Sequence, residues 1–380
     1  MNSSQNEFVD VLFEKEVMLM KPENTFNSKE SVDVGGSERI PSEMRAWEVA
    51  SPAPIDSSPS PIHFVKHPVP VPKTSEVLVR VISCGICHTD LHVAEGDLPV
   101  HHPHVIPGHE IIGRVVANGP QAGRFNLGDR IGVPWLRWTC GVCTYCRSGK
   151  ENLCPNSLYT GWDHDGGYAE YVTVPEGFAY RIPSAFNSVT AAPLLCAGII
   201  GYHAFRRANV PAGGRLGLYG FGGSAHLAAQ IAIAQGIEVH VFTRGKDAQR
   251  FALELGAASA QGVYDPSPVS LDSSILFAPV GDIVPKALEN LAAGGTLALA
   301  GIHLTDVPSL NYQNHLFHEK VLTSVESNTR RDGEEFLTLA DRLKIHPKTT
   351  EYPFEKADEA LRHLSHGDMQ GACVLRISEG

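Results

Sequence analysis

The segment between Arg215 and Phe242 constrains the fold more than any other part of the chain. It reads as an apolar strand, a glycine-rich turn, an apolar helix and a second apolar strand in direct succession. The turn has the pattern G-x-G-x-x-A, formed by Gly220, Gly222, Gly223 and Ala225. Glycine permits a tight turn and a close approach to the backbone, and the N-terminus of the following helix attracts phosphate. This succession predicts a βαβ unit that binds a dinucleotide.

Further along, two short apolar runs at 274–281 and 295–302 flank a helical stretch at 283–293. Continuous apolar runs of this length are typical of parallel strands that are buried on both faces. We therefore expect residues 191–318 to form an open, doubly wound parallel α/β sheet.

The preceding part of the chain follows a different pattern. Short strands broken by Gly and Pro are expected at 76–86, 104–119 and 166–175, which predicts a β-rich domain over residues 44–190. Residues 1–43 are rich in Ser, Asn, Glu and Lys without a sustained period. We expect a flexible extension there, with 11–20 as a candidate short helix. After 319, an amphipathic helix at 354–367 and a strand at 372–377 are expected.

Charge and composition exclude several classes of partner. The 380 residues carry a formal net charge of -11, whereas nucleic acid and anionic membranes both require a basic face. No apolar stretch reaches the roughly 18 to 20 residues of a membrane span. The N-terminus has neither a secretory signal nor the basic character of a mitochondrial transit peptide. We therefore expect a cytoplasmic protein that binds neither nucleic acid nor a membrane.

Four of the eight cysteines stand within fifteen positions, at Cys140, Cys143, Cys146 and Cys154. In a reducing compartment such clustering indicates metal binding before disulfides. Four thiolates at this spacing can hold one zinc ion in a closed tetrahedral site that orders the loop around it. A disulfide pair and an iron–sulfur cluster are the alternatives, although the last gap departs from the usual iron–sulfur run. We predict a structural zinc in a lobe at about 135–155.

A second group of metal-binding residue types is dispersed along the chain, at Cys87, His109 and Cys196. Catalytic zinc commonly takes three protein ligands, of which Cys2His is one set, and keeps a fourth position open. Glu110 and Asp90 stand beside two of these residues and are candidates for orienting the histidine or balancing charge. Taken singly, a cysteine on an apolar helix is more often a small core residue. Cys84 and Cys87 together also fit a redox pair or half of a zinc knuckle.

From Met44 to its C-terminus the chain resembles the zinc-containing alcohol dehydrogenases of the medium-chain dehydrogenase/reductase superfamily. The strings CGICHTDLH (84–92), PGHE (107–110), the four-cysteine lobe, AAPLLCAG (191–198) and GFGG (220–223) occur in this order and at similar spacings. The resemblance implies a GroES-like catalytic domain at 44–190, to which residues 319–380 return, and a Rossmann cofactor domain at 191–318. It also implies a homo-oligomer, either a dimer or a tetramer, with catalytic zinc on Cys87, His109 and Cys196.

The same resemblance assigns roles to the residues around Cys87. Thr89 matches a hydroxyl that contacts the substrate oxygen, His92 a histidine that passes the proton to solvent, and His88 a basic residue on the cofactor pyrophosphate. Cys84 falls at a position that binds no metal. Zinc would polarise the alcohol oxygen, Thr89 and His92 would carry its proton away, and hydride would leave for the nicotinamide ring.

The coenzyme is indicated by the residues after the second strand of the βαβ unit. An acidic residue about twenty positions after the glycine turn normally holds the ribose 2′-hydroxyl of NAD, but this chain has Thr243 and Arg244 there. A neutral residue removes the repulsion of a 2′-phosphate, and an arginine can pair with it. We therefore expect NADP, or use of both NADP and NAD, with a solvent-directed Arg244 as the alternative. Ala372 stands where many relatives carry a pyrophosphate-binding arginine, which leaves more of that contact to His88.

Trp135 and Leu136 match positions that line the alcohol pocket, and Trp162 is a third candidate. Packing in the domain core is the alternative for both tryptophans. Bulky apolar walls favour small or medium primary alcohols and their aldehydes. The sequence thus predicts an alcohol dehydrogenase with two zinc ions and NAD(P), acting on alcohols and aldehydes or ketones. An NADPH-dependent aldehyde reductase of the same superfamily is the runner-up, and a non-catalytic zinc- and cofactor-binding protein is the remote alternative.

Overall fold

The strand–turn–helix–strand segment begins a six-stranded parallel sheet in the structure, a computed structural model that describes residues 40–367 and 371–379. The strands lie in the order β12-β11-β10-β13-β14-β15, and all neighbouring pairs are parallel. Numbered along the chain, this order is 3-2-1-4-5-6, that of the Rossmann fold. The strands are β10 (Arg215–Tyr219), β11 (Glu238–Phe242), β12 (Ser259–Gln261), β13 (Leu271–Leu276), β14 (Leu291–Leu299) and β15 (Val321–Ser324).

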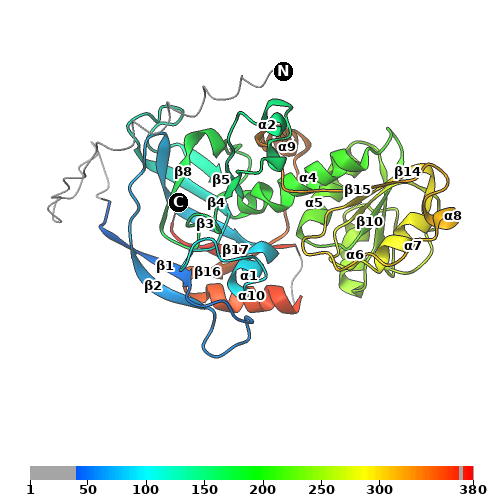
Figure 1. Ribbon diagram of the computed structural model, residues 1–380, viewed down its shortest axis with the longest axis horizontal. Helices are drawn as coiled ribbons and strands as arrows, with labels where there is room; N and C mark the ends of the chain where they lie inside the picture. Colours follow the sequence, from blue (N-terminus) through cyan, green and yellow to red (C-terminus); the bar gives the residue numbers. More distant parts are fainter. Residues whose placement is uncertain (1–39, 368–370, 380) are drawn as a thin grey trace, which may run out of the picture. The chain divides into compact units, whose positions relative to one another are not determined.

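Helices cover both faces of this sheet, which confirms the doubly wound architecture (Figure 1). Successive residues of a strand face opposite sides, and in β10 Leu218 packs into one hydrophobic core while Tyr219 packs into another. The first core includes residues of α4, α5 and α6, and the second includes residues of α7. The helices of this region are α4 (Ala197–Ala208), α5 (Gly223–Ala234), α6 (Lys246–Glu254), α7 (Ile283–Glu289) and α8 (Tyr312–His315).

The sheet continues past residue 318, where the sequence predicted its end. β15 pairs in parallel with β14 and is the sixth strand. Its four residues VLTS lack the continuous apolar run that marks the inner strands, and Val321 is 47% exposed. A short edge strand of this kind has no signature in the hydrophobic pattern, so the predicted boundary falls too early.

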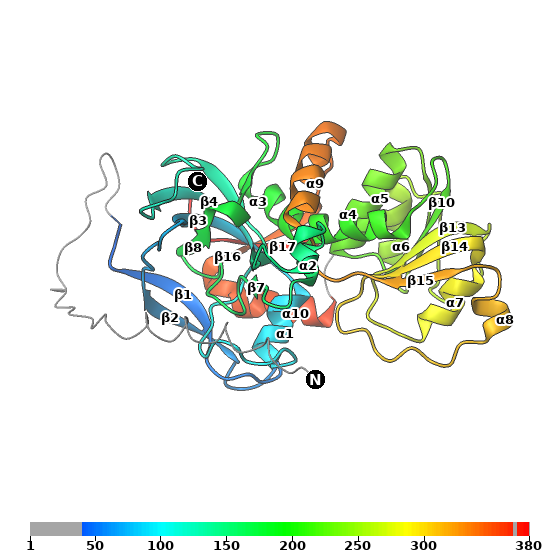
Figure 2. The same ribbon diagram turned by 45° about the horizontal axis from the view of Figure 1, so that its top comes forward.

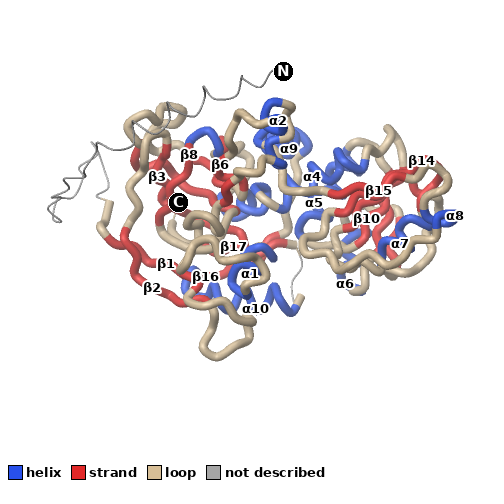
Figure 3. The backbone as a smooth tube through the Cα atoms, viewed as in Figure 1, coloured by secondary structure: helices blue, strands red, loops and turns tan. Residues whose placement is uncertain are grey.

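A second sheet, mostly antiparallel, is built from segments on both sides of the first in the sequence (Figure 3). Its order is β16-β17-β3-β4-β5-β9, and β8 also pairs with β3. β1 pairs with β2, and β6 with β7, in separate two-stranded sheets. The strands are β1 (Glu43–Val49), β2 (Ile62–Pro68), β3 (Glu76–Ile86), β4 (Glu110–Asn118), β5 (Arg130–Val133), β6 (Leu136–Trp138), β7 (Leu158–Tyr159), β8 (Tyr171–Pro175), β9 (Tyr180–Arg181), β16 (Thr349–Pro353) and β17 (Ala372–Arg376).

The end of the chain completes this second sheet. After α9 (Arg330–Leu343), β16 and β17 pair in parallel, and β17 pairs antiparallel with β3. The red C-terminal elements therefore lie beside the cyan β3 (Figures 1 and 2). The remaining helices are α1 (His88–Glu95), α2 (Thr144–Arg147), α3 (Ser188–Ala191) and α10 (Ala357–His366), with single 3-10 turns η1 (Glu151–Leu153), η2 (Glu176–Phe178), η3 (Ala192–Leu195) and η4 (Phe354–Lys356).

Residues 188–208 form one apolar, Ala- and Leu-rich stretch of the kind that predicts a helix, but the structure divides it into three elements. α3 passes into η3, which has a proline in its first turn, and Cys196 leaves helical geometry with φ -127° and ψ -72° before α4 begins. Proline removes a backbone donor and favours such a break. Among the described helices, no single one is long and apolar enough to span a membrane, and the bent pair 188–195 and 197–208 meets that test by length and composition alone.

The described residues from Ser42 onward form one compact unit. The predicted extension at 1–43 overlaps it slightly, because β1 begins at Glu43. Residues 1–39, with the candidate helix at 11–20, lie outside the described residues.

Candidate active site and metal centres

Three predicted ligands converge from the ends of separate elements. Cys87 precedes α1 directly after β3, His109 precedes β4, and Cys196 lies at the break before α4. Their donor atoms, together with a carboxylate oxygen of Glu110, all lie within 4.8 Å of one another. The fold thus brings three distant parts of the sequence to one point.

The two sulfur atoms of this set have the spacing that a zinc ion requires. Zn–S bonds of about 2.3 Å at tetrahedral angles hold two sulfurs about 3.8 Å apart, and Cys87 Sγ lies 3.9 Å from Cys196 Sγ. Both cysteines are free. The interaction with Cys196 holds the pKa of Cys87 well below its usual range, while that same contact and burial raise the pKa of Cys196. The thiolate that a metal requires is therefore favoured at Cys87.

Asp90 orients His109 in the donor set. Its Oδ1 accepts hydrogen bonds from His109 Nδ1 at 2.9 Å and Gly108 N at 3.0 Å, and its Oδ2 accepts from Cys87 N at 2.9 Å and the Tyr168 hydroxyl at 3.3 Å. A proton on Nδ1 leaves the lone pair of the neutral imidazole on Nε2, which is buried without a hydrogen-bond partner. Burial opposes protonation, but the charge and hydrogen bond of Asp90 raise the pKa of His109 well above its usual value. A metal ion would displace the proton from Nε2, and this buried nitrogen without a partner, beside two thiols, fits such an ion.

Glu110 lies closer to the donor set than the sequence indicated. It faces Gly85 across the β3–β4 register, and a Cβ at Gly85 would stand 1.8 Å from Glu110 Oε2. That oxygen is buried without a hydrogen-bond partner, and burial and the charge of Cys87 raise the pKa of the carboxyl group well above its usual value. Asp90 holds the histidine, whereas Glu110 offers a carboxylate oxygen as a fourth possible ligand atom beside those of Cys87, His109 and Cys196.

Helix α1 arranges the two proposed relay residues in succession. Thr89 is 6% exposed, and its Oγ1 lies 3.7 Å from Cys87 Sγ. His92 lies farther along the helix, with Nδ1 2.7 Å from Asp97 Oδ2. Its ring centroid is 4.4 Å from that of His303, which follows β14 and has a φ of 51°. The helix thus carries a hydroxyl at the donor set and a histidine farther out.

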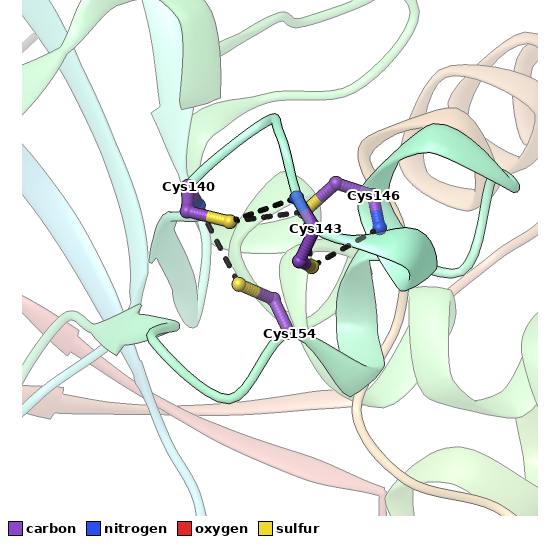
Figure 4. A group of neighbouring side chains, drawn as sticks. All are labelled: Cys140, Cys143, Cys146 and Cys154. Atoms are coloured by element: carbon purple, nitrogen blue, oxygen red, sulfur yellow. Dashed lines mark hydrogen bonds between the residues drawn. The ribbon is translucent and has the colours of Figure 1, made fainter. Parts of the chain in front are cut away.

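The four lobe cysteines also converge on one point (Figure 4). Cys143 Sγ lies 3.5 Å from Cys146 Sγ, which lies 4.0 Å from Cys140 Sγ. These spacings match a tetrahedral zinc site and exceed the S–S bond of about 2.05 Å by far. Backbone N–H groups of Val142 and Cys143 lower the pKa of Cys140 to about 6. The lobe therefore offers four sulfur ligands and leaves no position for a substrate.

Glu151 connects the lobe to α9. Its carboxylate accepts from Arg330 N at 2.8 Å, Nε at 3.0 Å and Nη2 at 2.7 Å. The Arg330 guanidinium also stacks 4.4 Å from the centroid of the Phe178 ring. A fork-to-fork pair of this kind fixes geometry as well as charge, so the lobe is joined firmly to the segment that follows the parallel sheet.

The glycine turn lies at the carboxyl end of β10, beside β13, where the strand order reverses. Gly220 has a φ of +88°, and a Cβ there would lie 2.9 Å from Ala278 N. Gly222 caps α5, and a Cβ on it would meet nothing within 4 Å, which leaves space at the helix N-terminus. Ala225 is fully buried under the turn. Ligands of open α/β sheets bind at such a switch point.

The residues around the turn differ in exposure. Thr243 and Arg244 follow β11, and Arg244 is exposed, as are Lys246 at the start of α6 and His88 at the start of α1. Two exposed cations therefore follow β11 at the edge of the sheet where the glycine turn also lies.

Buried contacts join the helix after the glycine turn to the C-terminal region. His226 of α5 is fully buried; its Nδ1 lies 3.1 Å from Gly222 O, and its Nε2 accepts from Lys348 N at 3.3 Å. Ala372 N donates to Lys348 O at 2.8 Å, which brings the start of β17 to the same region. The Lys348 ammonium lies 4.5 Å from the centroid of the Phe251 ring.

Comparison with known proteins identifies the family to which the chain belongs. Residues 73–184 match the model described as the alcohol dehydrogenase GroES-like domain. The probable alcohol dehydrogenase AdhA of Mycobacterium tuberculosis is 58% identical over 339 residues, which span 88% of this chain and 97% of that protein. This chain belongs to the zinc-containing alcohol dehydrogenase family. It is a medium-chain dehydrogenase/reductase that acts as an alcohol dehydrogenase.

Solved structures agree with this assignment. A cinnamyl alcohol dehydrogenase of Sorghum bicolor has a TM-score of 0.80 at 26% identity, covering 88% of this chain and 97% of that one. The crystal structure of CAD from Helicobacter pylori, complexed with NADP(H), has a TM-score of 0.80 at 25% identity, covering 88% of this chain and 98% of that one. The GroES-like and Rossmann architecture of the dehydrogenase is thereby confirmed.

Aromatic rings extend outward from the donor set of the dehydrogenase. The Trp135 ring meets His109 edge to face at a centroid distance of 5.0 Å and stacks on Tyr159 at 4.7 Å. Trp162 lies 6.0 Å from Trp135, stacks with His101 at 4.1 Å, and borders a hollow of about 150 Å³. Both tryptophans are partly exposed, as wall residues of a pocket would be.

Leu136, by contrast, has no exposed surface. The structure thus brings the tryptophans into one aromatic cluster and leaves Leu136 inside the protein. Its place in a substrate pocket stays a prediction.

Three residues near the candidate site were not predicted from the sequence. Tyr159 joins the aromatic cluster, His303 reaches His92, and Lys246 adds a second cation after β11. Lys246 stands two positions after Arg244, so its charge was a readable signal. The other two contacts depend on which loops meet in space, and no local pattern marks them.

Proposed function

We propose that this enzyme interconverts alcohols and the corresponding aldehydes or ketones, with NADP as the preferred hydride carrier. A zinc ion held by Cys87, His109 and Cys196 is the proposed centre of the reaction. The observation that carries this proposal is His109 Nε2, which Asp90 orients from the far side of the ring and which has no partner among the described residues.

Each residue around the proposed zinc is assigned a role according to its position. Zinc in this set supplies Lewis-acid polarisation of the substrate oxygen, and the nicotinamide supplies the hydride acceptor. Thr89 is proposed to act as a relay, in which Oγ1 accepts the alcohol proton while the hydroxyl passes its own proton onward, because this hydroxyl borders Cys87. His92 is proposed to deliver that proton to solvent, with Asp97 holding its ring by the 2.7 Å contact. Trp135 is the proposed wall that excludes water from the reacting atoms.

Metal analysis separates the enzyme from a scaffold that only kept the fold. We expect two zinc ions per chain, with Cys87→Ser losing one ion and nearly all turnover. Cys143→Ser is the matched control, since it removes a thiol of the lobe and should lose the other ion while the Cys87 site stays loaded. A single zinc per chain, or full turnover in Cys87→Ser, would contradict the proposal.

The preference for NADP rests on charge after β11. Thr243 leaves no carboxylate to repel a 2′-phosphate, and the exposed Arg244 and Lys246 supply positive charge. The Helicobacter pylori relative was also solved with NADP(H). We expect kcat/KM to favour NADP, and Arg244→Ala to reduce that preference by about tenfold or more, the value of one charged hydrogen bond.

Arg250→Ala is the control for this experiment, because Arg250 is an exposed arginine of α6 paired with Asp247. It should leave the coenzyme ratio unchanged. Comparable kcat/KM with NAD, unaffected by Arg244→Ala, would refute the NADP preference and leave the dehydrogenase assignment intact.

An NADPH-dependent aldehyde reductase is the second candidate, favoured by the same Thr243–Arg244 pair. The two directions are separated by comparing kcat/KM for an alcohol with NADP and for its aldehyde with NADPH at neutral pH. The homo-oligomeric state is proposed from the family resemblance, and sedimentation of the zinc-loaded chain tests it.

A further inference from the structure

Three arginines lie side by side across neighbouring strands of the β3–β4–β5 sheet. Arg80 of β3 stands opposite Arg114 of β4, and Arg114 stands opposite Arg130 of β5. Directly opposite residues of antiparallel strands share a face, where like charges destabilise the pairing. A nearby negative charge would therefore stabilise this row of three cations.

The described part of the chain does not supply that charge to two of the three. Arg114 donates to Gly128 O at 3.0 Å, and Arg130 donates to Pro183 O at 2.8 Å. Neither forms an ion pair with a carboxylate of the described residues, and burial with the neighbouring charge of Arg114 lowers the pKa of Arg130. Each guanidinium carries five N–H donors, so both retain donors beyond these carbonyl contacts.

Arg114 and Arg130 open onto a surface hollow of about 410 Å³, here called the arginine hollow. Its lining consists of Arg114, Asp129, Arg130, Arg181, Ile182 and Ser184. Asp129 is the acidic residue of this lining and pairs with Arg181 at 3.1 Å. Three guanidiniums against one carboxylate leave two positive charges, in a chain whose net charge is -11.

We propose that the arginine hollow binds a phosphate dianion, either inorganic phosphate or a phosphate monoester. A phosphate group carries a charge of about -1.5 to -2 at neutral pH, which balances the two uncompensated positive charges of the arginine hollow. Two of its oxygens can accept hydrogen bonds from the two parallel N–H groups of one arginine, and Ser184 adds a hydroxyl-bearing residue to the lining.

This site is separate from the reaction centre. Arg114 and Glu110 stand four positions apart on β4, which is about 14 Å along a strand. A phosphate between the arginines therefore does not reach the donor set of Cys87, His109 and Cys196. The hollow also shares no residue with the glycine turn, so it is distinct from the phosphates of the coenzyme.

Calorimetric titration of inorganic phosphate into the zinc-loaded enzyme tests the proposal, with the nicotinamide coenzyme saturating so that its own phosphate sites are filled. We expect one phosphate per chain, and binding at least about tenfold weaker in Arg130→Gln and in Arg114→Gln, since each removes a charged hydrogen-bond donor. Arg250→Gln should bind as the native enzyme does. A parallel titration with phenyl phosphate shows whether a monoester fits as well.

Thermal unfolding gives a second readout that does not depend on turnover. In phosphate-free buffer, Arg130→Gln should keep or raise the melting temperature, because it relieves repulsion in the row. Added phosphate should stabilise the native enzyme and not the variant. The proposal would be overturned if the native enzyme did not bind phosphate at millimolar concentration, or if Arg114→Gln and Arg130→Gln bound it as tightly as the native enzyme does. A lower melting temperature of both variants than of the native enzyme in phosphate-free buffer would also overturn it.

Discussion

Replacing Asp90 by asparagine tests the metal centre most directly, because Asp90 accepts four hydrogen bonds at once. An asparagine keeps an acceptor at one end of its side chain and places an N–H2 group at the other. In one orientation that group faces the donors of His109 and Gly108, and in the other it faces those of Cys87 and Tyr168. Either way, two buried donors lose their acceptor.

The magnitude follows from these contacts. Loss of the partner of a metal-binding histidine typically costs 10- to 100-fold in metal affinity, or about 1.4 to 2.7 kcal/mol. Each buried donor left without an acceptor costs about 1 to 3 kcal/mol of folding stability. We therefore expect Asp90→Asn to release one zinc ion at a 10- to 100-fold lower concentration of competing chelator than the native enzyme does.

The assay counts zinc released against a chromophoric chelator and follows turnover in parallel. The lobe zinc should stay bound, so that one ion per chain leaves and activity falls with it. Asp332→Asn is the control: Asp332 is equally buried, caps α9 and pairs with His203, so its loss should lower stability without releasing zinc. Native chelator resistance in Asp90→Asn would refute the role assigned to this carboxylate.

Three further outcomes are expected. Burial lowers the pKa of His226 to about 4, below its unfolded value of about 6.5, so stability should be lost as pH falls from about 6.5 towards 4; at pH 5 the loss is about 2 kcal/mol. Urea unfolding at pH 7 and pH 5 should show that loss in the native enzyme and less of it in His226→Gln, and equal losses would contradict this reading. Cys143→Ser should lower the melting temperature strongly, since a structural zinc contributes folding energy, while turnover of the folded fraction at low temperature stays near native; loss of that turnover would show that the lobe acts on the reaction. Gly220→Ala should raise the coenzyme Kd, because the turn needs a φ of +88° and a Cβ would press on Ala278 N at 2.9 Å; an unchanged Kd by fluorescence titration would count against the turn as the binding site.

Local patterns in the sequence were sufficient for much of the fold. The βαβ unit around Gly220 and the buried strands β13 and β14 were predictable because apolar runs and turn residues act over a few positions. The lobe was predictable for the same reason, since its four cysteines are neighbours in the chain. The end of the parallel sheet was missed because β15 is short and partly exposed.

The reaction centre required more than local patterns. Cys87 and Cys196 stand far apart in the sequence, and the family resemblance joined them before the structure gave their 3.9 Å separation. The contribution of Glu110 to the donor set depends on the absence of a side chain at Gly85 on the opposite strand. Contacts of that kind follow from strand register, which no hydrophobic period in one segment reveals.

The position of β17 has a consequence for the order in which the enzyme is made. The sheet that carries Cys87 and His109 receives β17, one of its inner strands, from the last residues of the chain, whereas the parallel sheet is contiguous from β10 to β15. Domains fold as units while the chain is being synthesised. The half with the parallel sheet can therefore mature on the ribosome, but the half that carries Cys87 and His109 stays unfinished until β17 has been synthesised, and a product truncated before β17 would form the first half without the second.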